Sequence, residues 1–389
     1  MPCLSLIAVV LFLASSALAG PWQSLGAFEG DNAERPWLSE QGPSMRAVAN
    51  VEQRGPGLRL MGPLARVEDR CWWDVDMPLD LSGMTEIEFS VRATKPTAIE
   101  RCSLHFRSGE GWYGGWFTLS GDTWQTIRLP RRAFESEGNS AGWGSIQGMR
   151  LSLWKKESKN TLFMLTGLRG RSDNILVIRN SHAQLAHPEE MPTIDRASKR
   201  VGDWLNESGV AVGQLDDSDI AEGLPTGCSI VLLPYNPYPP DTTLDALFQF
   251  AADGGRIIAA YCLPDKLAPI LGLAGKRYAA ADSTAPFTSI GFPASAGTGL
   301  PSAIRQDSWN ANIPELSGAR VLGLWQNGDE VLGELPAVTV SRHGAYIGHV
   351  LTNVDRDRKV QLLLALMAML QPEEGPALAQ ALMERAERL

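Results

Sequence analysis

The pattern of hydrophobic residues changes once along this chain of 389 residues, close to residue 170. Before that point, short runs alternate apolar and polar residues, as EIEFSVRA does at 86–93, and turn residues separate them. Alternation with a period of two is typical of half-buried strands. No segment from 25 to 170 shows a helical period, and nine of the twelve tryptophans lie before residue 155. This half therefore predicts an all-β sandwich of the jelly-roll type.

Beyond residue 174, continuous apolar runs alternate with helical patterns. The runs NILVIRN, SIVLLPYN and RIIAAYC are typical of strands buried on both faces, and we expect helices at 194–205 and 242–255. Strands of this kind between helices predict a parallel sheet with helices on both faces, a flavodoxin-like α/β domain. Two later apolar runs, joined by a hairpin turn at 342–344, predict an antiparallel extension of that domain.

The ends of the chain define further segments. Residues 1–19 join an uncharged apolar run to Ala17 and Ala19, the small-x-small pattern that signal peptidase cleaves. We therefore expect a signal peptide cleaved near Ala19 and a secreted or periplasmic protein. The β-sandwich would span 20–170, with a boundary near 167–173, followed by the α/β domain at 174–371 and a helical tail at 372–389. No stretch approaches the ~20 apolar residues of a membrane span.

Charge and cysteine content limit the partners and the covalent cross-links. The formal net charge of −9 provides no cationic surface in bulk, so nucleic acid is not an expected partner. Cys228 and Cys262 are expected at opposite ends of neighbouring strands, too far apart to pair. Cys71 and Cys102 lie on two separate strands of the sandwich, where a cross-strand disulfide and two free thiols are both open.

Three segments of the first half resemble a known family. DLSGMTEIEFSVRA, SLHFRSGEGWYGGWFTLSGDTWQTIRLP and GWGSIQGMRLSLW resemble the jelly-roll carbohydrate-binding modules of the family 11 and family 30-like kind. The second half resembles the class I glutamine amidotransferase-like domain, in the degenerate form found beside such modules in secreted proteins of the family 10 glycosylhydrolase-like kind. Together the resemblances cover about residues 20–370 and imply a carbohydrate-associated protein with a galactose-binding-like module.

The segment IIAAYCLPDKL, at 257–267, has the outline of a nucleophile elbow, because it runs from an expected strand through Cys262 into an expected helix. A working site also needs an activating histidine, a carboxylate and an oxyanion hole. The family motif G-x-C-x-G falls on Ala260, Cys262 and Pro264, and H-x-E falls on His349 and Leu351. Since most of these parts are missing, we expect a structural or vestigial Cys262 rather than a catalytic one.

Ligands of open parallel sheets bind at the carboxyl ends of the strands. Besides Cys262 and His349, the polar residues expected there are Asn180, Ser181, His182, Tyr235 and Asn236. His182 and His187 precede two glutamates on a loop, but they lack the fixed helical spacing of a zinc motif. We therefore expect no metal site at this edge.

The sandwich half holds the clearest ligand candidates. GWYGGW, at 111–116, brings Trp112, Tyr113 and Trp116 together, and if Phe117 faces the core, Trp116 faces outward. Tryptophan and tyrosine rings offer a flat apolar face and a polar edge, which suits the apolar faces of sugar rings. Further candidates are Arg107, Trp143 and Asp74. The resemblance also implies a structural Ca²⁺, for which Glu29, Asp31 and Glu34 could supply oxygens; we expect no other cofactor.

The sequence favours a secreted, non-catalytic, carbohydrate-associated protein with polysaccharide or oligosaccharide as its partner. Its second domain would be an inactive amidotransferase-like scaffold, that is, a pseudoenzyme. Two alternatives stay open: a cysteine-dependent hydrolase or amidase that uses Cys262 and His349, and an envelope protein that assembles through protein contacts or forms an oligomer. No pair of carboxylates for glycoside hydrolysis can be nominated.

Overall fold

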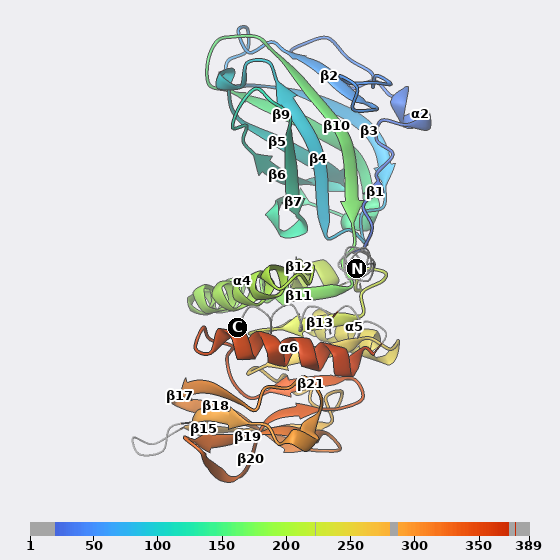
Figure 1. Cartoon of the computed structure of the whole chain (residues 1–389). Coiled ribbons are helices and arrows are strands. Elements are labelled where there is room, and N and C mark those ends of the chain that lie inside the picture. The colour runs from blue at the N-terminus through green and yellow to red at the C-terminus, as the bar shows by residue number, and fades with distance from the viewer. Residues whose placement is uncertain (1–19, 222, 281–286, 373–377, 379–389) are drawn as a thin grey trace, which may run out of the picture. The chain divides into compact units, whose positions relative to one another are not determined.

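The computed structural model describes residues 20–221, 223–280, 287–372 and 378, and the chain divides into two compact units. The β-unit spans residues 21–172, and the α/β-unit begins at Asp173 (Figure 1). The division lies within the expected boundary segment 167–173. The expected signal peptide at 1–19, and most of the expected tail at 372–389, lie outside the described residues. A β-rich architecture in two parts, as predicted, is confirmed.

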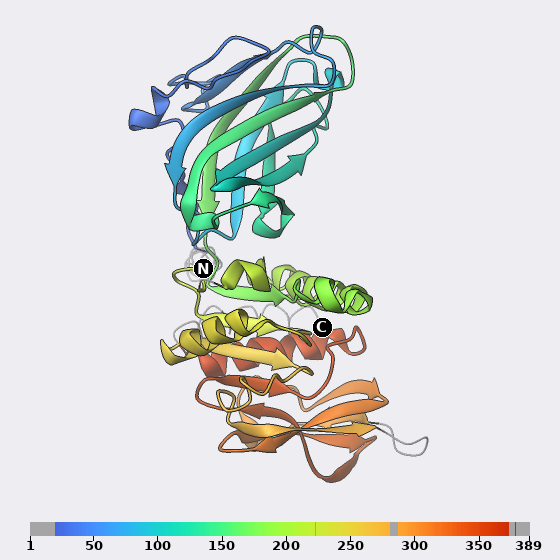
Figure 2. The same cartoon turned by 180° about the vertical axis from the view of Figure 1, so that it is seen from behind.

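The β-unit consists of two antiparallel five-stranded sheets. Figures 1 and 2 show them from opposite sides. One sheet has the order β1-β10-β4-β7, with β2 also paired to β10, and the other has the order β3-β9-β5-β6-β8. The strands are β1 (Gln23–Ser24), β2 (Gly57–Gly62), β3 (Arg70–Leu79), β4 (Glu86–Ala93), β5 (Ile99–Ser108), β6 (Glu110–Phe117), β7 (Gln125–Pro130), β8 (Phe134–Asn139), β9 (Ile146–Lys155) and β10 (Thr161–Arg171). The helical pieces are α2 (Gly30–Ala33), η1 (Pro96–Ala98), η2 (Arg131–Ala133) and η3 (Trp143–Ser145).

Alternating side chains of the two sheets build the core of the β-unit. From β3, Cys71, Trp73 and Val75 are buried in it, and from β4, Ile87 and Phe89 enter the same cluster. The opposite residues of each strand point away from this core, as a period of two requires. The alternation therefore fixes which side chains each sheet presents on its outer surface.

Cys71 and Cys102 are buried free thiols, so the disulfide left open by the sequence is not formed. Cys71 lies opposite Leu153, and Cys102 lies opposite the same residue from the other side, because β9 runs between β3 and β5. Two strand spacings of about 4.8 Å separate the cysteines, which exceeds the ~7 Å limit for a disulfide. Cys228 and Cys262 are also free, as predicted.

The α/β-unit is built on a nine-stranded sheet of order β12-β11-β13-β14-β21-β20-β19-β16-β17. The first five strands run parallel, and β20, which the expected hairpin turn joins to β21, runs antiparallel to them. The strands of this sheet are β11 (Ile175–Arg179), β12 (Gly213–Asp216), β13 (Ile230–Leu233), β14 (Arg256–Ala260), β16 (Phe287–Gly291), β17 (Ala303–Ser308), β19 (Arg320–Asn327), β20 (Glu330–Val340) and β21 (Gly344–Ile347). Two further strands, β15 (Leu273–Ala280) and β18 (Asn310–Leu316), form a separate two-stranded antiparallel sheet. The helices are α3 (Ala183–Ala186), η4 (Pro188–Glu190), α4 (Met191–Glu207), η5 (Asp217–Ile220), α5 (Asp241–Ala252), η6 (Ala294–Ala296) and α6 (Arg356–Leu370).

Helices cover both faces of the parallel strands. Ile175 and Val177 of β11 belong to the core that contains α4 and α6, whereas Leu176 and Ile178 belong to the core that contains α5. Each strand is therefore buried on both sides, which explains its continuous apolar sequence. Among the described residues, no helix has the length and apolar character needed to cross a membrane.

The helix expected after Cys262 does not form. Residues 265–272 are a series of turns instead, and β15 begins at Leu273. Pro269 has no N–H to bond the carbonyl of Asp265, four residues earlier, so a continuous helix is interrupted there. The segment after β14 consequently lacks the helix N-terminus that supports a nucleophile elbow.

Candidate functional site

The outer surface of the β3-β9-β5-β6-β8 sheet gathers four tryptophans. Trp72 of β3 lies opposite Ser152 of β9, which lies opposite Ser103 of β5, which in turn lies opposite Trp116 of β6. Two more indoles share this surface, those of Trp112 on β6 and Trp154 on β9. All four rings are half-buried. We call this surface the aromatic face.

Two arginines lie against the rings at one end of the aromatic face. Arg70 and Arg101 flank Trp154, with their guanidinium carbons 4.7 and 4.6 Å from the ring centre. Arg70 is also 5.1 Å from the ring centre of Trp72, and Arg101 is 4.3 Å from that of Trp116. Such cation–π contacts at partly exposed sites are worth about 0.5–1 kcal/mol, so a ligand can displace the arginines at small cost.

The aromatic face also carries buried polar atoms with no hydrogen-bond partner in the described part of the chain. They are Ser103 Oγ, Ser152 Oγ, His105 Nδ1, Trp154 Nε1 and Arg107 Nε. Both serines are fully buried. A buried polar group without a partner costs about 1–3 kcal/mol, and native proteins keep few of them. Five such atoms on one face make this surface the candidate site for a ligand with hydrogen-bonding groups.

Ion pairs hold the other end of the aromatic face. Arg150 bonds both oxygens of Asp74, at 2.7 Å each, and its guanidinium carbon is 4.6 Å from the ring centre of Trp112. Arg107 bonds Asp76 at 2.7 Å. A bidentate arginine–carboxylate pair fixes geometry as well as charge. The indole of Trp112, against which Arg150 lies, is therefore held in position.

His105 occupies the middle of the aromatic face. Its ring stands edge-on to Trp112 and Trp116, with centres 6.3 and 5.8 Å apart. Burial, and next the charge of Arg150, lower its pKa to about 4, so the ring is neutral at pH 7. A Cβ at Gly114 would lie 2.7 Å from the imidazole, so only glycine lets the ring pack this closely.

The structure sorts the ligand candidates proposed from the sequence into two groups. Trp112, Trp116, Arg107 and Asp74 all belong to the aromatic face. Trp143, by contrast, is only 5 % exposed and belongs to the core cluster. Tyr113 stacks on that ring at 4.3 Å and packs against the same core. We therefore leave both rings out of the ligand-contact set.

The sequence analysis missed half of the aromatic face. Trp72, Trp154 and their arginine neighbours were not singled out, nor were the buried serines and His105. A local signal was present for Trp72. Its neighbours Cys71 and Trp73 are buried in the core, so alternation places Trp72 on the outer surface, just as it places Trp116 there next to the buried Phe117. The order of the strands, which brings these residues together, has no local signal.

The expected calcium ligands make other contacts. Glu34 pairs with Arg46 at 2.9 Å, and Glu29 accepts a hydrogen bond from Ser24. Asp31 lies in the first turn of α2. Within the described ranges, no three His, Cys, Asp or Glu residues come together as a metal-binding group.

At the carboxyl ends of the parallel strands, the buried carboxylate of Asp217 organises the first loop. It accepts hydrogen bonds from Asn180 Nδ2 and Ser181 Oγ, both at 2.6 Å, and from the backbone N–H of His182 at 3.1 Å. Asn180 also bonds the backbone of Tyr238 in both directions. Sequence reasoning found the three donors but not Asp217. These polar groups satisfy one another, so they hold loops together rather than face a ligand.

Tyr235 and Asn236 follow β13 and lie near Cys262. The Tyr235 hydroxyl donates to Glu190 at 3.2 Å, and its ring stacks on Tyr261 with the centres 6.0 Å apart. The Asn236 side chain donates to Ile178 O at 3.1 Å. Burial raises the pKa of the Cys262 thiol to about 12. Because the thiolate is the nucleophile, this shift disfavours a reactive thiol near neutral pH.

The tight turn after β14 is centred on Tyr261, not on Cys262. Tyr261 has a φ of 60°, in the left-handed region that residues with side chains rarely adopt. The N–H of Cys262 bonds Ala260 O at 2.7 Å, which closes a three-residue turn around Tyr261. The position of the nucleophile in an elbow is therefore taken by a tyrosine, and the motif match made from the sequence was out of place by one residue.

His349 lies fully buried against Trp325, edge-on with the centres 5.7 Å apart. Its Nδ1 is 3.0 Å from Val350 O, and burial together with the charge of Lys359 lowers its pKa to about 3. The groups that influence Cys262 are different ones, namely Lys276, Asn236 and Glu190. No hydrogen bond or ion pair joins Cys262 to His349 in the part of the chain that the structure describes. A cysteine–histidine pair is not assembled.

The histidines of the loop after β11 engage their own surroundings. The ring of His187 stacks on Tyr238 at 3.7 Å, and its Nδ1 is 3.4 Å from Glu189. His182 is exposed. The two histidines thus make separate contacts and do not define a common ligand position.

Comparison with known proteins gives similarity in structure only. No protein-family model matches the sequence, and no curated protein matches it significantly. A β-galactosidase from Bacillus circulans sp. alkalophilus is similar over 52 % of this chain and 31 % of its own, at 15 % identity and a TM-score of 0.41. A β-galactosidase from Rahnella sp. R3 is similar over 51 % and 31 %, at 18 % identity and a TM-score of 0.40.

A putative ThuA-like protein from Bacteroides uniformis is similar over 50 % of this chain and 90 % of its own, at 14 % identity and a TM-score of 0.38. The match spans less than a third of the two β-galactosidase chains.

Proposed function

We propose that this protein is a secreted, non-catalytic glycan-binding protein whose aromatic face contacts the sugar. The observation that carries the proposal is the combination of four half-buried indoles with buried polar atoms that lack partners. Apolar ring faces and hydroxyl-binding atoms on one surface match the two-sided chemistry of a pyranose. The β-unit would then be a carbohydrate-binding jelly roll of the galactose-binding-like kind.

The arrangement of the aromatic face supports a groove-like mode of contact. The small residues Ser103, Ser152 and Gly114 lie in the middle of the aromatic face. The larger rings of Trp72 and Trp116 stand at the two ends of the row that contains both serines. Sugar rings would pack on the indoles and take the place of Arg70 and Arg101. Their hydroxyls would bond the buried atoms of Ser103 and Ser152, which need such partners once the arginines move aside.

In the same proposal, the α/β-unit is an inactive, flavodoxin-like scaffold of the amidotransferase-like kind. Tyr261 occupies the turn where a nucleophile would stand, and the thiol of Cys262 is neutral. Neither a histidine nor a helix N-terminus supports that turn. The scaffold would hold the β-unit or contact a partner.

Retention on a panel of soluble and insoluble polysaccharides tests this function. The mature full-length chain should bind at least one polymer, and Trp112→Ala and Trp116→Ala should each weaken retention at least tenfold. Trp124→Ala is the matched control, because Trp124 is also half-buried but bonds Glu52 and contacts Arg54 away from the aromatic face. Equal loss in the control, or no retention by the native chain, would overturn the proposal.

A further inference from the structure

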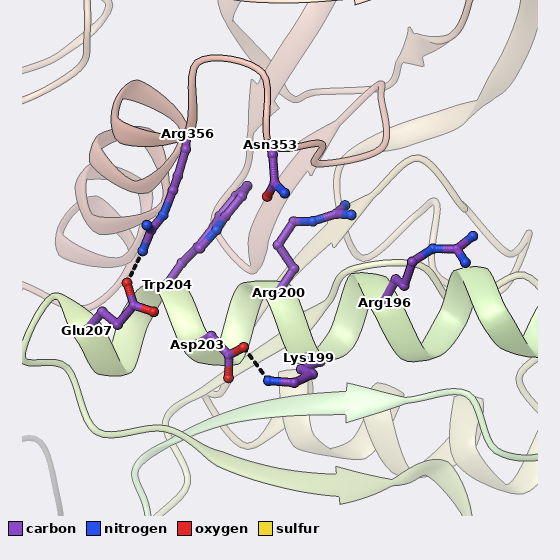
Figure 3. A pocket seen from close by; sticks show the side chains of 8 residues that line it. All are labelled: Arg196, Lys199, Arg200, Asp203, Trp204, Glu207, Asn353 and Arg356. Carbon is purple, nitrogen blue, oxygen red and sulfur yellow. Dashed lines mark hydrogen bonds and ion pairs between the residues drawn. The ribbon is translucent and has the colours of Figure 1, made fainter.

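The α/β-unit has a cavity of about 500 Å³ between α4 and the segment that leads into α6. Figure 3 shows the side chains that line it. Four of the eight lining residues are cationic, Arg196, Lys199, Arg200 and Arg356, and two are acidic. The walls thus carry a net charge of +2 at pH 7, in a protein whose overall formal charge is −9.

The two acids of the cavity are already paired. Lys199 Nζ lies 2.5 Å from Asp203, and Arg356 bonds Glu207. Arg196 and Arg200 make no ion pair with a carboxylate anywhere in the described ranges; Arg196 bonds the Thr193 hydroxyl at 3.3 Å, and Arg200 bonds Leu351 O at 2.6 Å. The excess charge of the cavity therefore resides on these two guanidinium groups.

These two arginines repel each other. They lie four residues apart on α4, so they are neighbours on one side of the helix, and like charges at this spacing are unfavourable. Burial and the charge of Arg196 also lower the pKa of Arg200, and the buried ammonium of Lys359 lies near enough to interact with it. An anion between the arginines would relieve this repulsion.

The geometry suits an oxyanion. Figure 3 shows Arg196 and Arg200 projecting from the side of α4 on which Asn353 lies, whereas Lys199 and Asp203 turn to the opposite side. The bond to Leu351 O fixes Arg200 in place while its remaining N–H groups stay available. A planar guanidinium bonds a carboxylate or phosphate through two parallel N–H groups, and the Asn353 amide offers a neutral donor beside it.

We propose that this cavity binds a small oxyanion, a carboxylate or phosphate, held between Arg196 and Arg200 with Asn353 as a third contact. Arg356 is paired with Glu207, so the two guanidinium groups without a carboxylate partner are the ones left to hold the anion. The site lies within the α/β-unit and is independent of the aromatic face. It gives that unit a ligand-binding role without any nucleophile.

Calorimetric titration of the full-length mature chain with inorganic phosphate and with malonate, at constant ionic strength, tests the site. The native chain should show saturable binding of at least one anion, and Arg200→Gln should weaken it tenfold or more. Arg196→Gln should weaken it several-fold. Arg46→Gln removes the same charge from an exposed position of the β-unit and should leave the Kd unchanged.

Thermal unfolding without added anion separates a binding role from a structural one. Because Arg196 and Arg200 repel each other, Arg196→Gln should keep or raise the unfolding temperature of the anion-free chain while it reduces anion affinity. Binding of neither anion would overturn the proposal. Unchanged affinity in the double variant Arg196→Gln/Arg200→Gln would overturn it as well.

Discussion

Ser103 on β5 and Ser152 on β9 lie directly opposite each other, and both hydroxyls are buried without a hydrogen-bond partner in the described structure. Alanine at both positions would leave the pairing of β5 with β9 unchanged. The serines stand between Trp72 and Trp116, in the row that spans the aromatic face. Under the proposed function, a bound glycan would supply the hydrogen-bond partners that these hydroxyls lack.

Replacing both serines tests whether their hydroxyls lower the stability of the free protein and raise its affinity for glycan. Ser103→Ala/Ser152→Ala removes two buried polar atoms with no partner, so the free energy of unfolding should stay equal or rise by about 1 kcal/mol. Glycan affinity should fall at the same time. Chemical denaturation measures the first quantity and retention on the bound polysaccharide measures the second. A loss of more than 1 kcal/mol for the double variant would mean that the hydroxyls are already satisfied.

Gly114 tests the packing that holds His105 in the aromatic face. A Cβ at Gly114 would lie 2.7 Å from the imidazole, so Gly114→Ala must move that ring and should cost about 1–3 kcal/mol. Gly121→Ala is the control, since its Cβ would meet nothing within 4 Å. Denaturant midpoints of the two variants give the comparison. Equal stability of both variants would contradict the close packing of His105.

The thiols test the proposed inactivity of the turn after β14. Burial raises the pKa of Cys262, Cys228 and Cys71 to about 12, and burial together with Cys71 also raises the pKa of Cys102. Iodoacetamide at pH 7.5 should therefore leave the folded chain from residue 20 onward unmodified and should label its four cysteines after unfolding. Mass spectrometry counts the labels. Rapid labelling of Cys262 in the folded chain would restore the hydrolase alternative.

His349 predicts how the stability of the α/β-unit depends on pH. An unfolded histidine binds its proton near pH 6.5, whereas burial holds the pKa of His349 at about 3. Between these values the unfolded state binds more protons, so stability falls as the pH is lowered, by up to about 1.4 kcal/mol per unit. Calorimetric unfolding at pH 7 and pH 5 should show this decline, reduced in His349→Leu.

The native chain is the reference against which His349→Leu is compared. An equal decline from pH 7 to pH 5 in His349→Leu and in the native chain would show that other groups are responsible.

Local patterns predicted much of this fold and part of its site. Alternation placed Trp116 outward from Phe117, and the continuous apolar runs identified the parallel strands. The partner rows of the aromatic face could not be predicted, because β9 lies between β3 and β5 and no local pattern specifies that order. The same strand order separates Cys71 from Cys102.

The turn after β14 escaped prediction for a different reason. Which residue of the sequence YCLP takes a positive φ depends on where β14 ends. The end of the strand is fixed by two hydrogen bonds to the Tyr261 carbonyl, which Asn312 and Tyr346 donate at 2.7 Å each. Both donors lie more than fifty residues away in sequence. The sequence therefore suggested an elbow but could not locate its central residue.

The most direct test of the central claim is calorimetric titration of the chain from residue 20 to residue 389 with an oligosaccharide of the polymer that retains it. Native protein and Trp124→Ala should bind with the same Kd, and the double variant Trp72→Ala/Trp154→Ala should lose at least a hundredfold in affinity while it remains folded. Equal affinity in the native chain and the double variant would show that the sugar binds elsewhere and that the aromatic face is not the site.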